Sequence, residues 1–299
     1  MEKILITGGT GFIGRNLIPL LQENNYNITI KTRTPDKFQD DFFFRNVNFI
    51  WELEEAPTVD IVLNLCGENL ADKRWSRNQK ITIYNSRIQN TIELVDWMIK
   101  QEQKPHTFIS GSAIGYYGAR GDETLNEMSK HGDLKQFQSK LCHNWELSAK
   151  RAAQEGIRTA IIRTGIVLGQ EGALAKMLKP FKLGLGGKIG SGKQWMSWIH
   201  IQDQIQAIMH LISNSQQFGV FNLTAPNPVT NLSFTQTLAK IVNKPAKVAV
   251  PAFVLKAALG EFSELLLTGQ KVLPEALQKS GFEFQFPELE LALADLLKD

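Results

Sequence analysis

Near its start the sequence reads Lys3-Ile4-Leu5-Ile6-Thr7-Gly8-Gly9-Thr10-Gly11-Phe12-Ile13-Gly14, an apolar run that leads directly into spaced glycines. The run fits a buried strand, and the apolar periodicity from Ile13 to Asn24 fits a helix immediately after it. In such a unit the glycines allow a tight turn and close approach of the backbone to a pyrophosphate, while the helix N-terminus offers free N–H groups. We therefore predict a dinucleotide site that uses Gly8, Thr10, Gly11, Phe12, Ile13 and Gly14.

The second predicted strand ends at Arg33, where an NAD-specific site keeps a carboxylate for the ribose hydroxyls. A carboxylate would repel the 2'-phosphate of NADP, whereas Arg33 can hold it with paired N–H donors, a contact worth roughly 1.5–3 kcal/mol. NADP(H) is therefore the predicted cofactor. Two alternatives stay open: Arg33 is a solvated surface side chain, or Asp36 faces a ribose.

Buried-strand patterns alternate with helical patterns along the first half of the chain. This rhythm predicts an α/β fold with a doubly wound parallel sheet. The expected core is residues 1–168, with 199–224 returning to it, and residues 169–198 and 225–299 form a smaller lobe. We predict that Asp203 caps a helix reaching Leu211 and that His200 fixes the backbone at a strand end. The expected strands are Lys3–Thr7, Asn27–Thr32, Asp60–Leu65, His106–Ser110 and Arg158–Arg163, and the expected helices include Ile13–Asn24, Ile81–Lys100 and Leu141–Glu155.

The composition narrows the functional classes. The chain has 299 residues, 43% of them hydrophobic, and a formal net charge of +3. The spacing of the two cysteines and five histidines does not match that of metal ligands. No apolar run reaches the roughly eighteen residues of a membrane span. We expect a cytoplasmic protein, monomer or homodimer, with no metal, no nucleic acid and no membrane partner.

Several segments resemble a known superfamily, that of the NAD(P)-dependent epimerases and dehydratases, the extended branch of the short-chain dehydrogenases/reductases. Within it the chain is similar to an atypical subfamily labelled nucleoside-diphosphate-sugar epimerase or SulA-like, with a short C-terminal domain. The resemblance covers nearly the whole chain. It rests on Gly8–Gly14, Asn64–Glu68, Arg74–Trp75, Ser86–Arg87, Trp145–Glu146, Arg163–Gly169, Trp198–Ile201, Ala225–Asn231 and Gly269–Val272.

The resemblance implies a Rossmann core and a set of further cofactor contacts. Geometry agrees for Leu65 and Cys66, because the end of their strand should border the glycine loop in a doubly wound sheet. Arg87 lies on the next predicted helix, from which it can reach the cofactor groove. The alternative interpretation is that it is an exposed helical arginine. The implied contacts are Thr32, Arg33, Leu65, Cys66, Gly67, Thr82, Arg87 and Ser110.

The catalytic residues are less clear. The superfamily uses a serine or threonine with a Tyr-x-x-x-Lys pair, in which the lysine lowers the pKa of the tyrosine. Ser112 occupies the place of the hydroxyl, unless it only satisfies a turn. No tyrosine in this sequence is followed by a lysine four residues later. If Lys140 is taken as the lysine of the motif, Gln136 occupies the tyrosine position. If the motif is aligned on Trp145-Glu146, Gln138 and Cys142 occupy the tyrosine and lysine positions. The nearest substitutes are Tyr116 and Tyr117, which core packing would also explain, and then Glu123 and His143.

These observations predict an NADP(H)-binding oxidoreductase or epimerase-like isomerase. Its small-molecule substrate is unidentified, and a nucleotide-sugar-like compound is one candidate. The alternative is a catalytically silent NADP(H)-binding sensor or regulatory protein, which the missing tyrosine and lysine favour.

Overall fold

A seven-stranded parallel sheet forms the centre of the protein, seen in a computed structural model that describes residues 1–38 and 41–298. The strand order is β11-β7-β5-β4-β1-β2-β3, which confirms the predicted doubly wound α/β fold. Two of the strands, β3 and β11, were not among those expected. The bounds are β1 Lys3–Thr7, β2 Asn27–Lys31, β3 Val47–Ile50, β4 Ile61–Asn64, β5 Thr107–Ala113, β7 Arg158–Thr164 and β11 Gly219–Leu223.

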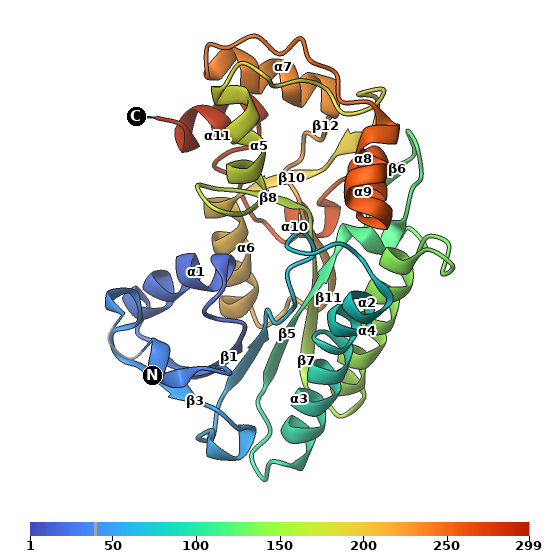
Figure 1. Cartoon of the computed structure of the whole chain (residues 1–299). Helices are drawn as coiled ribbons and strands as arrows, with labels where there is room; N and C mark the ends of the chain where they lie inside the picture. The colour runs from blue at the N-terminus through green and yellow to red at the C-terminus, as the bar shows by residue number, and fades with distance from the viewer. Residues whose placement is uncertain (39–40, 299) are drawn as a thin grey trace.

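Helices cover both faces of this sheet (Figure 1). Helices α1 (Phe12–Glu23) and α6 (Ile201–Ser213) lie on one side, and α2 (Arg77–Asn85), α3 (Ile88–Lys100) and α4 (Phe137–Gln154) lie on the other. Successive residues of a strand point to opposite faces, and the central strands are buried on both, so they read as unbroken apolar runs. In β1, Ile4 and Ile6 join the core beneath α1, while Leu5 joins the core beneath α3.

The helix predicted from Ile81 to Lys100 is two helices in the structure. Helix α2 ends at Asn85 and α3 begins at Ile88, with Ser86 and Arg87 between them. The apolar period continues across the break, which is why the pattern suggested one helix. The break turns the Arg87 side chain inward, toward Trp145 of α4.

The prediction that Asp203 caps α6 is wrong. The N-cap is His200, whose Nδ1 accepts a hydrogen bond from the Gln202 N–H at 3.0 Å, and this confirms that His200 fixes the backbone. Asp203 is buried in the first turn and its carboxylate instead accepts from the Gln285 and Phe286 amides, at 2.8 and 3.0 Å. A carboxylate cap and an inward-facing carboxylate look alike in sequence, because only the tail 82 residues later supplies the partner.

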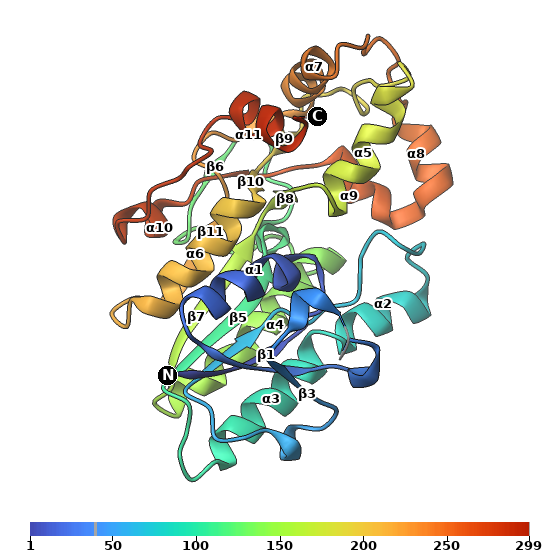
Figure 2. The ribbon, with the colours of Figure 1, turned by 90° about the vertical axis from the view of Figure 1, so that its left-hand side faces the viewer.

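A lobe lies beyond the carboxyl ends of the strands, at the end of the molecule away from the N-terminus (Figures 1 and 2). Parallel pairing of β6 with β13 joins the core to the lobe, with Thr124 opposite Lys271. Within the described residues, no helix has both the length and the hydropathy needed to cross a bilayer. The lobe and its connections contain β6 Thr124–Leu125, β8 Ile166–Leu168, α5 Gly172–Lys182, β9 Trp195–Met196, β10 Trp198–His200, β12 Val229–Thr230, α7 Asn231–Ile241, α8 Ala252–Leu259, α9 Ser263–Leu267, β13 Lys271–Val272, α10 Glu275–Lys279 and α11 Leu289–Leu296.

Candidate functional site

The glycine loop between β1 and α1 has the geometry of an anion cradle. Gly8 has a φ of +74°, and a Cβ there would lie 2.6 Å from the carbonyl of Leu65. A Cβ on Gly14 would lie 2.2 Å from the carbonyl oxygen of Gly9. Helix α1 begins after Gly11 with no side-chain cap, so the amides of its first turn, from Phe12 on, can bind an anion.

The turn after β4 is held against this loop by Asn64. Its Oδ1 accepts from the Thr7 hydroxyl at 2.7 Å and from the Cys66 amide at 3.2 Å, and its Nδ2 donates to Thr91 at 2.8 Å. The backbone of Leu65 and Cys66 therefore borders the glycine loop. Asn64 lies in one of the resembling segments, but the sequence does not identify it as a site residue, because its role depends on partners on β1 and α3.

At the tip of β2, Arg33 is exposed and forms no ion pair with another described residue. The neighbouring arginine, Arg15 in the first turn of α1, is already engaged: it donates to Asp41 at 3.2 Å and lies over the ring of Phe44. Arg33 is thus the guanidinium at this tip that has its donors available. Thr32 lies beside it and donates its amide to the carbonyl of Ile50.

Arg87 lies between the turn after β4 and a cavity. It donates to the carbonyls of Glu68 and Ile83 at 3.0 and 3.3 Å and stacks over Trp145, 5.4 Å from the ring centroid. Burial lowers the pKa of this guanidinium, and within the described chain it forms no ion pair with a carboxylate. A Cβ on Gly67 would lie 2.8 Å from its Cζ, so Gly67 leaves the room that Arg87 occupies.

The cavity has a volume of about 340 Å³ and lies between the carboxyl ends of the sheet strands and the lobe. Ser112 and Arg87 line its core side, and Met177, Trp195 and Leu266 line its lobe side. Its walls are mostly apolar, with a few converging polar groups, as is usual for small-molecule sites. The remaining lining residues include Trp75, Gln138, Leu141, Cys142, Trp145, Thr164, Ile166, Ile189, Gln194, Asn231, Leu265 and Gln270.

Ser112, at the end of β5, belongs to a buried charged network. Its Oγ donates to Glu146 Oε1 at 2.8 Å, and Glu146 is held by Arg163 through Nε at 2.7 Å and Nη2 at 2.8 Å. The side chains of Arg163 and Glu146 are only 2% and 1% exposed, so this paired geometry is shielded from water. Both residues were missed as site residues. Their only sequence signal was membership in the resembling segments.

Tyr116 and Tyr117 do not line the cavity. The hydroxyl of Tyr117 donates to Asn222 at 2.7 Å and accepts from Arg163 Nη1 at 2.9 Å, and burial raises its pKa to about 12. Tyr116 lies against the Arg163 guanidinium, 3.4 Å from the ring centroid to Cζ, and burial raises its pKa too. Both rings support the network under Ser112.

The two alignments of the Tyr-x-x-x-Lys motif place its tyrosine and lysine positions differently relative to the cavity. Gln138 and Cys142, one turn apart on α4, both line the cavity, whereas Lys140 is exposed and Gln136 lies at the start of α4 outside it. Burial raises the pKa of the Cys142 thiol to about 12. Among the described lining residues, Arg87 and Cys142 are the titratable ones, and neither exchanges a proton readily near neutral pH.

Other expected site residues lie apart from the cavity. Thr82 is exposed on α2 and its hydroxyl donates to the Asn78 carbonyl. Ser110 is fully buried within β5. His143 and Glu123 do not line the cavity either, and Glu123 forms an ion pair with Arg120. The described residues contain no group of three or more potential metal ligands.

Comparison with known proteins identifies the family. The model of the NAD dependent epimerase/dehydratase family matches residues 4–224. The chain belongs to this family. A second model, that of a domain of unknown function designated DUF1731, matches residues 250–296, and together they confirm the resemblance found in the sequence.

Relatives of this epimerase-family chain match it along its whole length. It is 38% identical to Epimerase family protein YfhF of Bacillus subtilis strain 168 over 99% of this chain and 98% of the relative. It is 40% identical to Epimerase family protein SA0724 of Staphylococcus aureus strain N315, with both chains fully covered. A solved structure, human epimerase family protein SDR39U1 with NADPH, matches with a TM-score of 0.90 and 34% identity over 98% of each chain.

Proposed function

We propose that this chain is an NADP(H)-binding oxidoreductase or epimerase-like enzyme whose small-molecule substrate occupies the cavity beneath the lobe. The observation that carries the proposal is the position of Arg87: it contacts the turn that borders the glycine loop and also lines the cavity. A dinucleotide on the glycine loop would extend along this edge of the sheet toward Ser112. The nicotinamide would then face the cavity.

NADP(H) rather than NAD(H) is the proposed cofactor. Arg33 supports this choice, because an exposed guanidinium at the tip of β2 can hold a 2'-phosphate. The solved human relative, which contains NADPH, supports it independently. Arg87, a half-buried cation with no carboxylate partner in the described chain, suits an anionic or hydroxyl-rich part of the same cofactor.

The second candidate is a binding protein without turnover. It is favoured by the cavity itself, where Gln138 stands in place of an ionisable tyrosine and Cys142 in place of the lysine. Glutamine cannot exchange a proton, and a thiol with a pKa of about 12 is a poor acid or base near neutrality. An enzyme built on this cavity would therefore have to exchange protons with the substrate or with water, and not with a residue that lines the cavity.

Isotope transfer separates the two candidates. The protein is incubated with NADPH carrying deuterium at C4 and with a fractionated metabolite extract, and the products are examined by mass spectrometry. Deuterium in any product, abolished by heat denaturation of the protein, supports catalysis. Cofactor that binds, as shown by its fluorescence, but never transfers label would contradict the enzymatic proposal and leave the binding protein.

A further inference from the structure

The charges in the segment from Gly172 to Gly260 are strongly one-sided, whereas the rest of the lobe includes acidic residues such as Glu261, Glu264 and Glu275. Between Gly172 and Gly260 the only acidic residue is Asp203, whose side chain is buried with 0% exposure. The same stretch contains no arginine and the lysines Lys176, Lys179, Lys182, Lys188, Lys193, Lys240, Lys244, Lys247 and Lys256. The whole chain has a net charge of only +3, so the positive charge is concentrated here.

Two loops of this stretch lie side by side. The Val250 amide donates to the Lys188 carbonyl at 2.9 Å, and the Gly190 amide donates to the Val250 carbonyl at 2.9 Å. Helix α5 leads into the first loop and α8 leads out of the second. Figure 2 shows α5 and α8 together at the end of the molecule opposite the N-terminus. We call residues 179–193 and 244–258 the lobe tip.

Large apolar side chains project from the lobe tip into solvent. The exposed fractions are 75% for Leu183, 59% for Leu185 and 73% for Phe253, and Val248 and Val254 are also exposed. Helix α8, with the sequence AFVLKAAL, contains no buried residue. These side chains belong to two short segments that hydrogen bond to each other, and a patch of exposed apolar side chains marks a contact site rather than a packed core.

The lysines around these side chains are available. Lys179, Lys182, Lys193, Lys244, Lys247 and Lys256 are exposed, and none forms an ion pair with a carboxylate in the part of the chain that the structure describes. The lysines outside the tip differ: Lys176 pairs with Asp72 and Lys240 with Glu290. Two carboxylates follow the tip closely in the chain: Glu261 pairs with Lys80, and Glu264 lines a pocket together with Lys256.

We propose that the lobe tip binds the surface of a membrane that contains anionic lipids. Leu183, Leu185 and Phe253 would enter the boundary between headgroups and acyl chains, and the surrounding lysines would contact headgroup phosphates. Clustered lysines beside exposed apolar side chains are the combination that interfacial anchors use. A nucleic acid would match the charge but would leave the protruding aliphatic side chains without a partner.

This binding requires no membrane span. Helix α8 has 8 residues, far fewer than a bilayer core requires, so the lobe tip lies on the surface. The expectation of no membrane partner rested on the lack of a long apolar run, which concerns spans and not surface contacts. The cavity opens within the same lobe, since Ile189 and Leu266 line it, so surface binding would place the cavity close to the lipid.

The test uses the full-length chain and sedimentation with vesicles. We expect binding to phosphatidylcholine vesicles that contain about 30% phosphatidylglycerol, at least about tenfold weaker binding to pure phosphatidylcholine, and loss of binding at high salt. Phe253→Ser should weaken binding about tenfold or more, as expected for losing one buried aromatic ring. The double change Lys244→Ala and Lys247→Ala should weaken it roughly thirtyfold on anionic vesicles.

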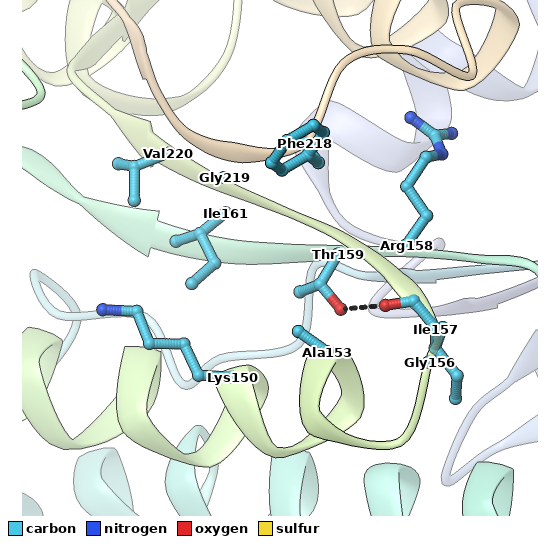
Figure 3. Close-up of a pocket in the computed structure, with 10 residues that line it drawn as sticks. All are labelled: Lys150, Ala153, Gly156, Ile157, Arg158, Thr159, Ile161, Phe218, Gly219 and Val220. Carbon is cyan, nitrogen blue, oxygen red and sulfur yellow. Dashed lines mark hydrogen bonds between the residues drawn. The ribbon is translucent and has the colours of Figure 1, made fainter.

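The matched control is Phe218→Ser. Phe218 is 74% exposed, about as exposed as Phe253, but it lines a different surface, the groove between α4 and the strands β7 and β11 (Figure 3). It should leave vesicle binding unchanged. Circular dichroism of each variant confirms that the chain is folded. Equal binding to neutral and anionic vesicles, equal effects of Phe218→Ser and Phe253→Ser, or a stable dimer that ignores vesicles would each overturn the proposal.

Discussion

Arg33 is the residue through which we propose that the protein selects NADPH over NADH. Its guanidinium is exposed and forms no ion pair with a carboxylate of the described chain, so no ion pair has to be broken when it binds a phosphate. We predict that Arg33→Ala weakens NADPH binding about tenfold or more while leaving NADH binding almost unchanged. Titration of the reduced cofactors, followed by fluorescence, measures both. Lys37→Ala, a neighbouring exposed cation, is the control, and equal losses for NADPH and NADH in Arg33→Ala would show that the assignment is wrong.

Glu146 is predicted to matter for stability as well as for the site. In Glu146→Ala the buried Arg163 loses both bonds to its carboxylate, and breaking such a pair costs about 3–5 kcal/mol of the free energy of unfolding. Urea denaturation measures the cost. Lys150→Ala removes the exposed and distant partner of the same carboxylate, 4.0 Å away, and should change stability by less than about 1 kcal/mol. Similar effects from both changes would contradict the buried network.

At the scale of the element, Gly8 joins β1 to α1 under two constraints, a positive φ and contact with the turn after β4. Gly281 has a similar φ of +87°, but a Cβ added there would have no atom within 4 Å. Gly8→Ala should therefore destabilise the protein by more than Gly281→Ala, whose cost is the roughly 1–2 kcal/mol of a left-handed backbone. Only Gly8→Ala should abolish NADPH binding. Thermal unfolding and fluorescence titration check the pair, and identical behaviour would exclude the close approach to Leu65.

The N-cap of α6 makes stability depend on pH. Burial lowers the pKa of His200 from 6.5 to about 4, so the unfolded chain binds the proton more readily than the folded one. Stability is therefore fully present above pH 6.5 and is lost as the pH falls toward 4, by up to about 3 kcal/mol. His200→Asn keeps an N-cap acceptor but cannot titrate, and it should flatten this part of the curve of unfolding free energy against pH. An unchanged slope would show that other groups cause it.

At the scale of the whole molecule, the lobe and the sheet are predicted to unfold together. The tail crosses both: β13 pairs with β6, and the amides of Gln285 and Phe286 bind the carboxylate of Asp203. Removing residues 250–299 would leave Asp203 buried without these partners, so the shortened chain should not fold. Calorimetry of the intact chain should show a single transition. Two separate transitions, or a folded fragment 1–249, would contradict this coupling.

The sequence predicts the sheet better than it predicts the cavity, for a physical reason. The strand at Ile4 and the loop at Gly8 are local features, so periodicity and spacing reveal them. The contacts of Glu146 with Ser112 and Arg163 join residues 34 and 17 positions away, and no local pattern encodes them. The same holds for α6, whose start was misjudged because Asp203 meets its partners only in the folded tail.

One bond described above determines what the cavity can accept. The Ser112 hydroxyl donates its hydrogen to Glu146 and also lines the cavity, so toward a guest its oxygen is left to accept a hydrogen bond. A guest carrying its own hydrogen, such as an alcohol or an amine, can bind there without disturbing anything. A bare ketone would have to pull that hydrogen away from a carboxylate first, and would therefore bind at a disadvantage.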